Sequence, residues 1–177
     1  MLTLTHISFF VYVIYLTLVL RYIGEIPQSL SETYYFLGSK RYPSADWQDN
    51  FDRLIASLFT LAMWAMAFTL LPAMLDVTPE NLQFLVFLAL AGICFVGAAP
   101  EFKQKYEGRV HTVSAWFAAV FGLSWAMFAA KGYIPLAASL TFSLAAGFAT
   151  ATLKRSLTFW MELVAFNTVF ISLMSMM

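Results

Sequence analysis

The sequence from Leu82 to Ala99 reads LQFLVFLALAGICFVGAA and contains no charged residue. A helix of roughly 20 apolar residues is long enough to cross the hydrocarbon core of a bilayer, which is about 30 Å thick. Five further apolar runs of similar length occur in the chain, and together the six occupy residues 2–22, 51–75, 82–99, 112–130, 134–152 and 157–176. The pattern predicts an all-α, polytopic membrane protein with about six transmembrane helices.

The composition agrees with this prediction. Of the 177 residues, 61% are hydrophobic and 11% are charged, whereas soluble domains contain roughly 45–50% apolar and about 25% charged residues. The segments between the runs are too short for a soluble domain. We therefore expect a single integral membrane domain over residues 1–177, in contact with membrane lipids. The first run lacks the basic start and cleavage site of a signal peptide and is interpreted as a retained helix.

The basic residues are unevenly distributed between the predicted loops. Nine of the ten Lys and Arg lie in or near loops 23–50, 100–111 and 153–156, and only Lys131 lies on the other side. Since basic residues near span ends tend to remain in the cytoplasm, we expect these three loops to be cytoplasmic and both termini to be non-cytoplasmic. The formal net charge is zero, so no nucleic-acid partner is expected.

The first cytoplasmic loop carries helix signals. Ser29 and Glu32 have the spacing of a capping box, and Gly38 suits the end of a helix. We predict a short interfacial helix through Tyr34, Tyr35 and Phe36, whose aromatic residues suggest that it lies on the membrane surface.

The fourth and fifth spans each carry small residues at every fourth position. Small residues on one face let two membrane helices approach closely. Because only a tight turn joins these spans, we predict an antiparallel hairpin packed through the two stripes, Ser114, Ala118, Gly122, Ala126 and Ala130 in one and Ala137, Thr141, Ala145 and Ala149 in the other.

Ionisable groups inside a span are the first candidates for function, because each costs roughly 2.5–3.5 kcal/mol on insertion scales. Glu162 lies inside the cytoplasmic start of the sixth span, and Asn167 follows deeper in the same helix. The functional hypothesis makes Glu162 a proton carrier or the polar anchor of a ligand cavity. The alternative is a structural carboxylate that pairs with Arg155, Lys154 or Arg109.

The densest group of titratable residues lies in the third predicted loop and includes Glu101, Glu107, Arg109 and His111. A histidine beside carboxylates suits a general base or a metal ligand, since its unperturbed pKa lies near neutrality. The alternative is a solvated charged loop that ends in an interfacial histidine.

Other signals of catalysis are weak. The second histidine, His6, is expected at the opposite membrane face, and no HExxH, GxSxG or phosphate-binding glycine loop occurs. Cys94 is the only cysteine, which excludes an internal disulfide and a multi-thiolate metal site within one chain. We therefore expect no metal site and no cofactor, and favour a protein that is not an enzyme.

Two stretches resemble uncharacterised small membrane proteins of gut-type bacteria and their phages. They are IPQSLSETYYFLG at residues 26–38 and FVGAAPEFK at residues 95–103, the latter continuing to EGRVH at 107–111. The resemblance implies a role at the cell inner membrane, and supplies no activity and no catalytic residue.

The favoured hypothesis is a membrane protein that binds or transports a lipid or another small hydrophobic molecule through a cytoplasm-facing cavity. Its candidate ligand-binding residues are Glu162, Asn167, His111, Glu101, Glu107 and Arg109. One alternative is an oligomerising phage-type membrane protein, such as a holin or exclusion factor, that uses the small-residue faces between copies of the chain as a homo-oligomer. A second alternative is an intramembrane hydrolase built on the histidine and the two glutamates of the third loop.

Overall fold

The computed structural model describes residues 2–38, 50–101, 103 and 105–177. All regular structure in these residues is helical, which confirms the predicted fold class. The elements are α1 (Leu2–Ile23), α2 (Thr33–Gly38), α3 (Asn50–Val77), the 3-10 helix η1 (Glu80–Leu82), α4 (Gln83–Ala98), α5 (Lys105–Phe128), α6 (Tyr133–Ala149) and α7 (Leu157–Met176).

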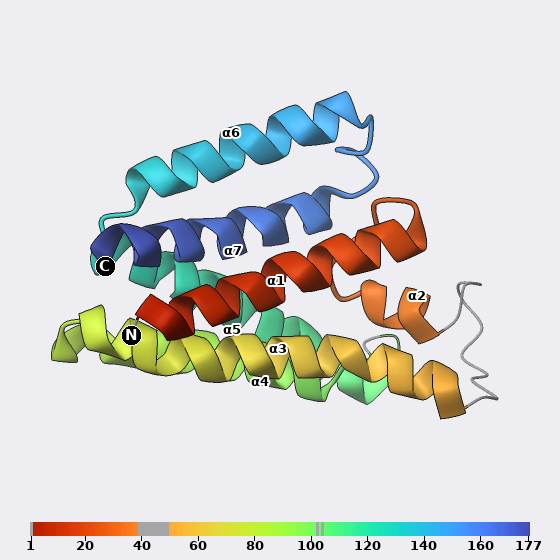
Figure 1. Cartoon of the computed structure of the whole chain (residues 1–177), viewed down its shortest axis with the longest axis horizontal. Coiled ribbons are helices and arrows are strands. Elements are labelled where there is room, and N and C mark those ends of the chain that lie inside the picture. The colour runs from red at the N-terminus through yellow and green to blue at the C-terminus, as the bar shows by residue number, and fades with distance from the viewer. Residues whose placement is uncertain (1, 39–49, 102, 104) are drawn as a thin grey trace.

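Five of these helices, α1, α3, α4, α5 and α7, are long and apolar enough to cross a membrane. The shorter apolar helix α6 has 17 residues, which at 1.5 Å per residue gives about 26 Å, slightly less than a typical bilayer core. The six helices run alongside one another, and both termini lie at the same end of the bundle (Figure 1). The chain is a polytopic helical membrane protein.

Helix α5 begins earlier than hydropathy predicts. The apolar run starts at residue 112, but the helix starts at Lys105, so that part of the predicted loop 100–111 is helical. The first two turns contain Lys105, Glu107 and Arg109, which are good helix formers but are polar. A hydropathy window registers the apolar part of a helix and misses a polar extension beyond the membrane.

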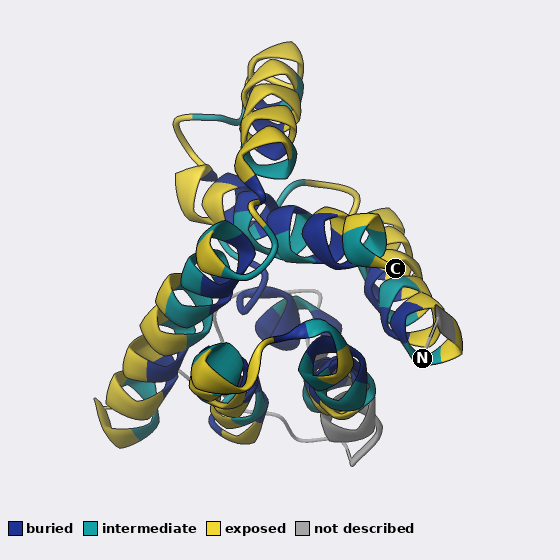
Figure 2. Cartoon of the chain, turned by 90° about the vertical axis from the view of Figure 1, so that its left-hand side faces the viewer, coloured by how far each residue is buried: buried dark blue, intermediate teal, exposed yellow. Residues whose placement is uncertain are grey.

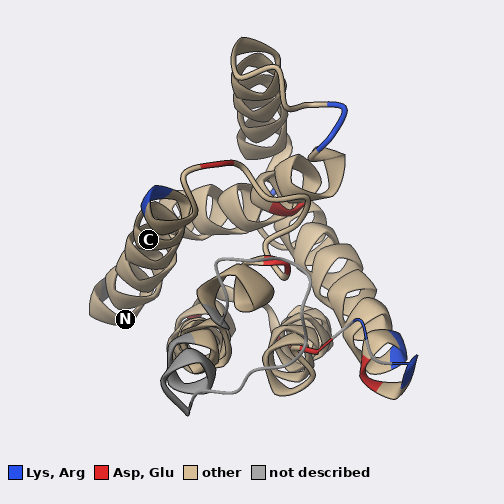
Figure 3. Cartoon of the chain, turned by 90° about the vertical axis from the view of Figure 1, so that its right-hand side faces the viewer, with Lys and Arg blue, Asp and Glu red and all other residues tan. Residues whose placement is uncertain are grey.

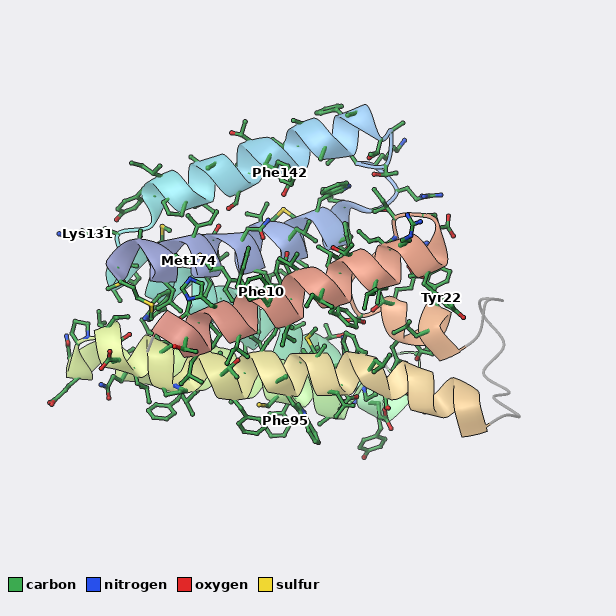
Figure 4. All side chains as sticks on the ribbon, in the orientation of Figure 1. Phe10, Tyr22, Phe95, Lys131, Phe142 and Met174 are labelled. Atoms are coloured by element: carbon green, nitrogen blue, oxygen red, sulfur yellow. The ribbon has the colours of Figure 1, made fainter. Side chains whose placement is uncertain are left out.

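The core of the bundle lies between α1, α3, α4, α5 and α7. Helix α3 packs against α1 and α4, and α4 packs in turn against α5. Several large side chains are fully buried in this core, including Phe59, Met66, Leu70, Met74, Trp125 and Phe170. The outward faces are also apolar: Figure 2 shows exposed residues along every long helix, and the phenylalanines labelled in Figure 4, Phe10, Phe95 and Phe142, are exposed. Such an apolar exterior is the surface expected in contact with lipid chains.

The predicted small-residue stripe of the fourth span is a packing surface, but its partner is α4. A Cβ atom added at Gly92 of α4 would lie 2.6 Å from the Ala118 nitrogen and 2.7 Å from the Ser114 oxygen of α5. The two backbones are therefore in direct contact at this glycine. The hairpin predicted between the fourth and fifth spans is wrong in this respect.

Helix α6 packs instead against α7. Its buried face consists of Ser139, Ser143 and Gly147. The stripe predicted to pack, Ala137, Thr141, Ala145 and Ala149, is exposed. Both sets have a spacing of four residues, so the sequence period alone does not select the face that becomes buried.

The short helix predicted in the first loop is present as α2, next to α1 and α3. Its aromatic side chains do not lie on the membrane surface as predicted, since Tyr34 and Tyr35 are buried in the main core. The Tyr34 ring makes an edge contact with Phe59 of α3, with ring centroids 6.3 Å apart. The helix therefore lies at the end of the bundle with its rings directed inward.

Candidate functional site

Residues 26–37, called the plug segment below, fold back into one end of the bundle. Nearly all of them are buried or half-buried, including the polar residues Ser31, Glu32 and Thr33. Figure 3, which looks at this end, shows the segment between the surrounding helices. Buried backbone outside regular helices is stable only where other groups satisfy its N–H and C=O groups. The partners of this backbone therefore define the site.

The predicted capping interaction forms within the plug segment. The Ser29 hydroxyl accepts a hydrogen bond from the Glu32 N–H over 3.2 Å. The Glu32 carboxylate reaches back and accepts from the Gln28 N–H over 2.6 Å, one residue before the position of a standard capping box. Glu32 is only 4% exposed, and the hydrogen bond from the Gln28 N–H holds its buried carboxylate in place.

Glu162 holds the same turn from the opposite side. Its carboxylate accepts a hydrogen bond from the Leu30 N–H over 2.6 Å, between residues 132 positions apart in sequence. A bond from a neutral N–H to an ionised carboxylate is charge-assisted and stronger than one between neutral groups. The candidate anchor of a ligand cavity thus binds a peptide group of the chain itself.

The start of α7 supplies further contacts. The Phe159 N–H donates to the Gln28 carbonyl over 2.9 Å, and the Ser156 hydroxyl and Arg155 guanidinium both donate to the Ile26 carbonyl. Arg155 also forms an exposed ion pair with Glu25 at 3.5 Å.

The alternative hypothesis, that Glu162 is a structural carboxylate paired with Arg155, Lys154 or Arg109, is therefore wrong about these partners. Lys154, Arg155 and Arg109 are all exposed, and Arg155 binds Glu25 and the plug backbone instead. Among the described residues, Glu162 takes its hydrogen bond from a main-chain N–H and pairs with no basic side chain.

His111 holds the plug segment from α5. It is 5% exposed, and its two ring nitrogens lie 2.8 Å from the Ala99 carbonyl oxygen and 2.7 Å from the Ser31 hydroxyl. The Ala99 carbonyl is an acceptor, so the nitrogen that faces it carries a proton. The solvated interfacial histidine of the alternative interpretation is not observed, because the ring links α5, the end of α4 and the plug segment.

The two glutamates of the third predicted loop bind near the same segment. The Tyr34 hydroxyl donates to the Glu101 carboxylate over 3.4 Å, and the Glu107 carboxylate accepts from the Glu101 N–H over 3.2 Å. Burial raises the pKa of the Tyr34 phenol above its ordinary value, and the Glu101 carboxylate raises it further. The phenol therefore remains protonated and able to donate at physiological pH.

Lys103 approaches the ring of Tyr35 from the same loop. Its main-chain N–H donates to the Tyr35 hydroxyl over 3.0 Å, and its ammonium lies 5.0 Å from the ring centroid, within the range of a cation–π interaction. Partial burial lowers the pKa of the lysine, while Glu32 acts in the opposite direction.

Two of the six predicted site residues lie elsewhere. Asn167 accepts a hydrogen bond from the Tyr12 hydroxyl over 3.2 Å, deeper in the bundle between α7 and α1. Arg109 is exposed on α5. The structure thus brings Glu162, His111, Glu101 and Glu107 around the plug segment, and leaves Asn167 and Arg109 outside this arrangement.

Sequence reasoning missed the central part of the site, which is the plug segment itself. Leu30, Ser31 and Glu32 make the contacts that join the predicted residues. The capping-box spacing and Pro27 indicate an ordered turn there, but neither signal indicates burial. Within the described part of the chain, no group of three or more His, Cys, Asp or Glu residues is arranged to hold a metal ion.

Charge separates the two ends of the bundle. The basic residues in the described part of the chain at the plug end are Arg21, Arg53, Lys103, Lys105, Arg109, Lys154 and Arg155, and Figure 3 shows basic residues in blue at this end. Lys131 lies at the other end, close to both termini (Figure 4). Lys40 and Arg41, which belong to the same predicted side as the first group, lie outside the described residues. The asymmetry expected from the sequence is thus a feature of the folded chain.

Comparison with known proteins adds no relative, since no protein-family model, curated protein or solved structure matches the chain. The fold defines the class of the protein, a polytopic helical membrane protein.

Proposed function

We propose that this protein binds or transports a small molecule, a lipid or another amphipathic compound, at the end of the bundle that the plug segment closes. The segment acts as a gate: it occupies polar groups that a ligand uses when the segment withdraws. Known channels and transporters likewise place irregular backbone at membrane depth only where it lines or fills an interior path.

The observation that carries the proposal is the bond between Glu162 and the Leu30 N–H. A carboxylate inside a membrane span is costly unless it is satisfied, and here its partner belongs to a segment that is neither helical at that point nor part of a span. An N–H or O–H group of a ligand has the same chemistry as the Leu30 N–H. When a donor group of the ligand replaces the Leu30 N–H at the Glu162 carboxylate, ligand binding is coupled to movement of the plug segment.

The proposed location is the cell inner membrane, with the plug end in the cytoplasm and both termini outside. The basic residues of the plug end support this orientation through the positive-inside rule. Reporter fusions after Met177 and within the Asp76–Asn81 turn test it: we expect activity only from a reporter that works outside the cytoplasm, and activity of a cytoplasmic reporter at either position contradicts it.

The binding proposal is tested by native mass spectrometry of the protein released from nanodiscs. Wild type is compared with Glu162→Gln and with Glu80→Gln, which removes an exposed carboxylate at the opposite end. We expect a retained small molecule or lipid on wild type and on the Glu80 variant, and at least tenfold less on the Glu162 variant.

Folding of each variant is checked by circular dichroism and by its elution from a sizing column. Equal retention by folded Glu162→Gln and wild type contradicts the assignment of the site. If wild type releases no bound species, flux of candidate solutes in proteoliposomes is the remaining test, and absence of flux refutes the proposal.

A second candidate function, assembly into a homo-oligomer that acts on the membrane, is favoured by one observation. Helix α6 exposes the four small residues Ala137, Thr141, Ala145 and Ala149 along one face, and such faces support helix pairing in membranes. The same native mass spectra report the number of subunits. A ligand-free oligomer, dissociated by Ala145→Leu and unaffected by Glu162→Gln, would favour this second function.

A further inference from the structure

Two carboxylates hold the plug turn by its main chain. Glu162 of α7 accepts from the Leu30 N–H and Glu32 accepts from the Gln28 N–H, each over 2.6 Å. The two differ in origin, because Glu32 belongs to the plug segment and moves with it, whereas Glu162 belongs to a membrane span. Of these two carboxylate bonds, only the one from Leu30 to Glu162 must break when the segment separates from α7, together with the bonds that Phe159, Ser156 and Arg155 donate to the Gln28 and Ile26 carbonyls.

Among the side chains that the structure describes, no basic group forms an ion pair with Glu162. Arg155, which directly precedes α7, is engaged with Glu25 and the Ile26 carbonyl. The other titratable or charged groups that the structure places around the plug segment include Glu32, Tyr34 and Tyr35 of the segment itself, Glu107 and His111 of α5, Glu101 and Lys103 of the preceding loop, and Tyr15 of α1. None of these, among the described residues, forms a hydrogen bond or ion pair with Glu162.

A carboxyl group in this setting has two states with different effects on the segment. The ionised form accepts a charge-assisted bond from the Leu30 N–H, and the protonated form accepts only a neutral one, which is roughly half as strong. A proton taken up from the aqueous phase at this end also removes the cost of a charge within the span. Protonation therefore stabilises Glu162 in the membrane and loosens its hold on Leu30.

We propose that Glu162 is a proton-binding site that controls the plug segment: the ionised carboxylate holds Leu30 and keeps the segment in place, and the protonated carboxyl releases it. This inference rests on the proposed gate function and deepens it, since it names the proton as the species that opens the gate. In this proposal the contact between His111 and the Ser31 hydroxyl persists when the Glu162 bond breaks, so the segment moves about Ser31.

The test is hydrogen–deuterium exchange, read by mass spectrometry, of the full chain in nanodiscs at two pH values. Protection of peptides covering residues 26–37 is expressed relative to intrinsic exchange at each pH. In wild type we expect protection of these amides to fall about tenfold at the lower pH, the loss that corresponds to replacing a charge-assisted bond by a neutral one. Glu162→Gln, which mimics the protonated carboxyl, should show the low protection at both pH values.

Matched variants identify the titrating group. Glu80→Gln should behave as wild type, and Glu162→Asp should retain a pH dependence. His111→Gln should lower protection at both pH values and leave the pH-dependent step in place. The inference is overturned if the pH-dependent change in protection disappears in His111→Gln and persists in Glu162→Gln. It is also overturned if protection in wild type does not change with pH.

The two proposals fail separately. A pH-independent plug segment in a protein that retains a ligand through Glu162 refutes the proton site and leaves the binding function standing. A segment released by protonation, in a protein without ligand or flux, refutes the binding function and leaves the proton site standing.

Discussion

The substitution Gly92→Ala should separate α4 from α5. The added Cβ atom would lie 2.6 Å and 2.7 Å from two main-chain atoms of α5, about 0.8 Å closer than ordinary van der Waals contact permits. Because neither atom belongs to a flexible side chain, the helices themselves must move. Overpacking of this kind costs roughly 1–3 kcal/mol. Because both clashes are with main-chain atoms, we place the cost in the upper half of this range, and after the gain of up to about 1 kcal/mol from replacing glycine within a helix we expect a net loss of about 1–2 kcal/mol.

Gly122→Ala is the matched control, since it makes the same change on the facing helix. Its Cβ atom would lie 3.5 Å from Val169 and 3.9 Å from Ala89, at ordinary contact distance. We expect it to be neutral or to stabilise the protein by up to about 1 kcal/mol.

The assay is equilibrium unfolding of both variants in mixed micelles of increasing SDS content, followed by tryptophan fluorescence. The fully buried Trp125 of α5 makes this signal sensitive to the core. Equal unfolding free energies for the two alanine variants would refute the close approach of α4 and α5.

Three further predictions concern buried polar contacts. Trp125→Phe removes the bond from the indole N–H to the Thr78 hydroxyl, 2.7 Å long, and leaves a void, so unfolding measurements should show a loss of about 2–3 kcal/mol; a loss below about 0.5 kcal/mol would contradict this. A double-mutant cycle of Tyr12→Phe and Asn167→Ala should give a coupling energy of about 0.5–1.5 kcal/mol, and additivity would exclude their bond. Burial and Glu101 raise the pKa of Tyr34 in the folded state. The contribution of this phenol to folding stability is therefore fully present below the pKa of the unfolded state, about 10, and is lost progressively as the pH rises above it. The free energy of unfolding from pH 9 to 11 should fall more steeply for wild type than for Tyr34→Phe, and parallel curves would refute this.

The spans were predictable because each depends on a local property, the length of an apolar run. The boundaries of α7, 157–176, agree with the prediction. The start of α5 does not, because Lys105–Arg109 is helical without being apolar.

The pairing of helices was only partly predictable. The stripe through Gly122 correctly identifies a packing face, but the sequence does not name α4 as its partner. Helix α6 carries two faces of small residues, and the packed one consists of Ser139, Ser143 and Gly147. Since both faces repeat every fourth residue, the choice depends on the tertiary fit to α7.

The candidate site was predictable as a set of residues but not as an arrangement. Insertion cost correctly directs attention to Glu162, and charge density directs it to His111. The partner of Glu162 is a main-chain N–H 132 residues away, and main-chain groups carry no sequence signal. Side-chain reasoning therefore assigned Glu162 an arginine or lysine that in the structure lies in solvent or binds the plug backbone.

The central claim is that the chain after α1 folds back onto the start of α7, and cross-linking tests it most directly. In a Cys94→Ala background, Glu25→Cys is combined with Arg155→Cys, which replaces an exposed ion pair of small energetic value. As a control, Lys131→Cys, at the opposite end of the bundle, is combined with Arg155→Cys. The account predicts that a short thiol-reactive cross-linker joins the first pair rapidly in membranes and does not join the second. Failure to join residues 25 and 155 in a chain whose two thiols are both reactive would contradict it.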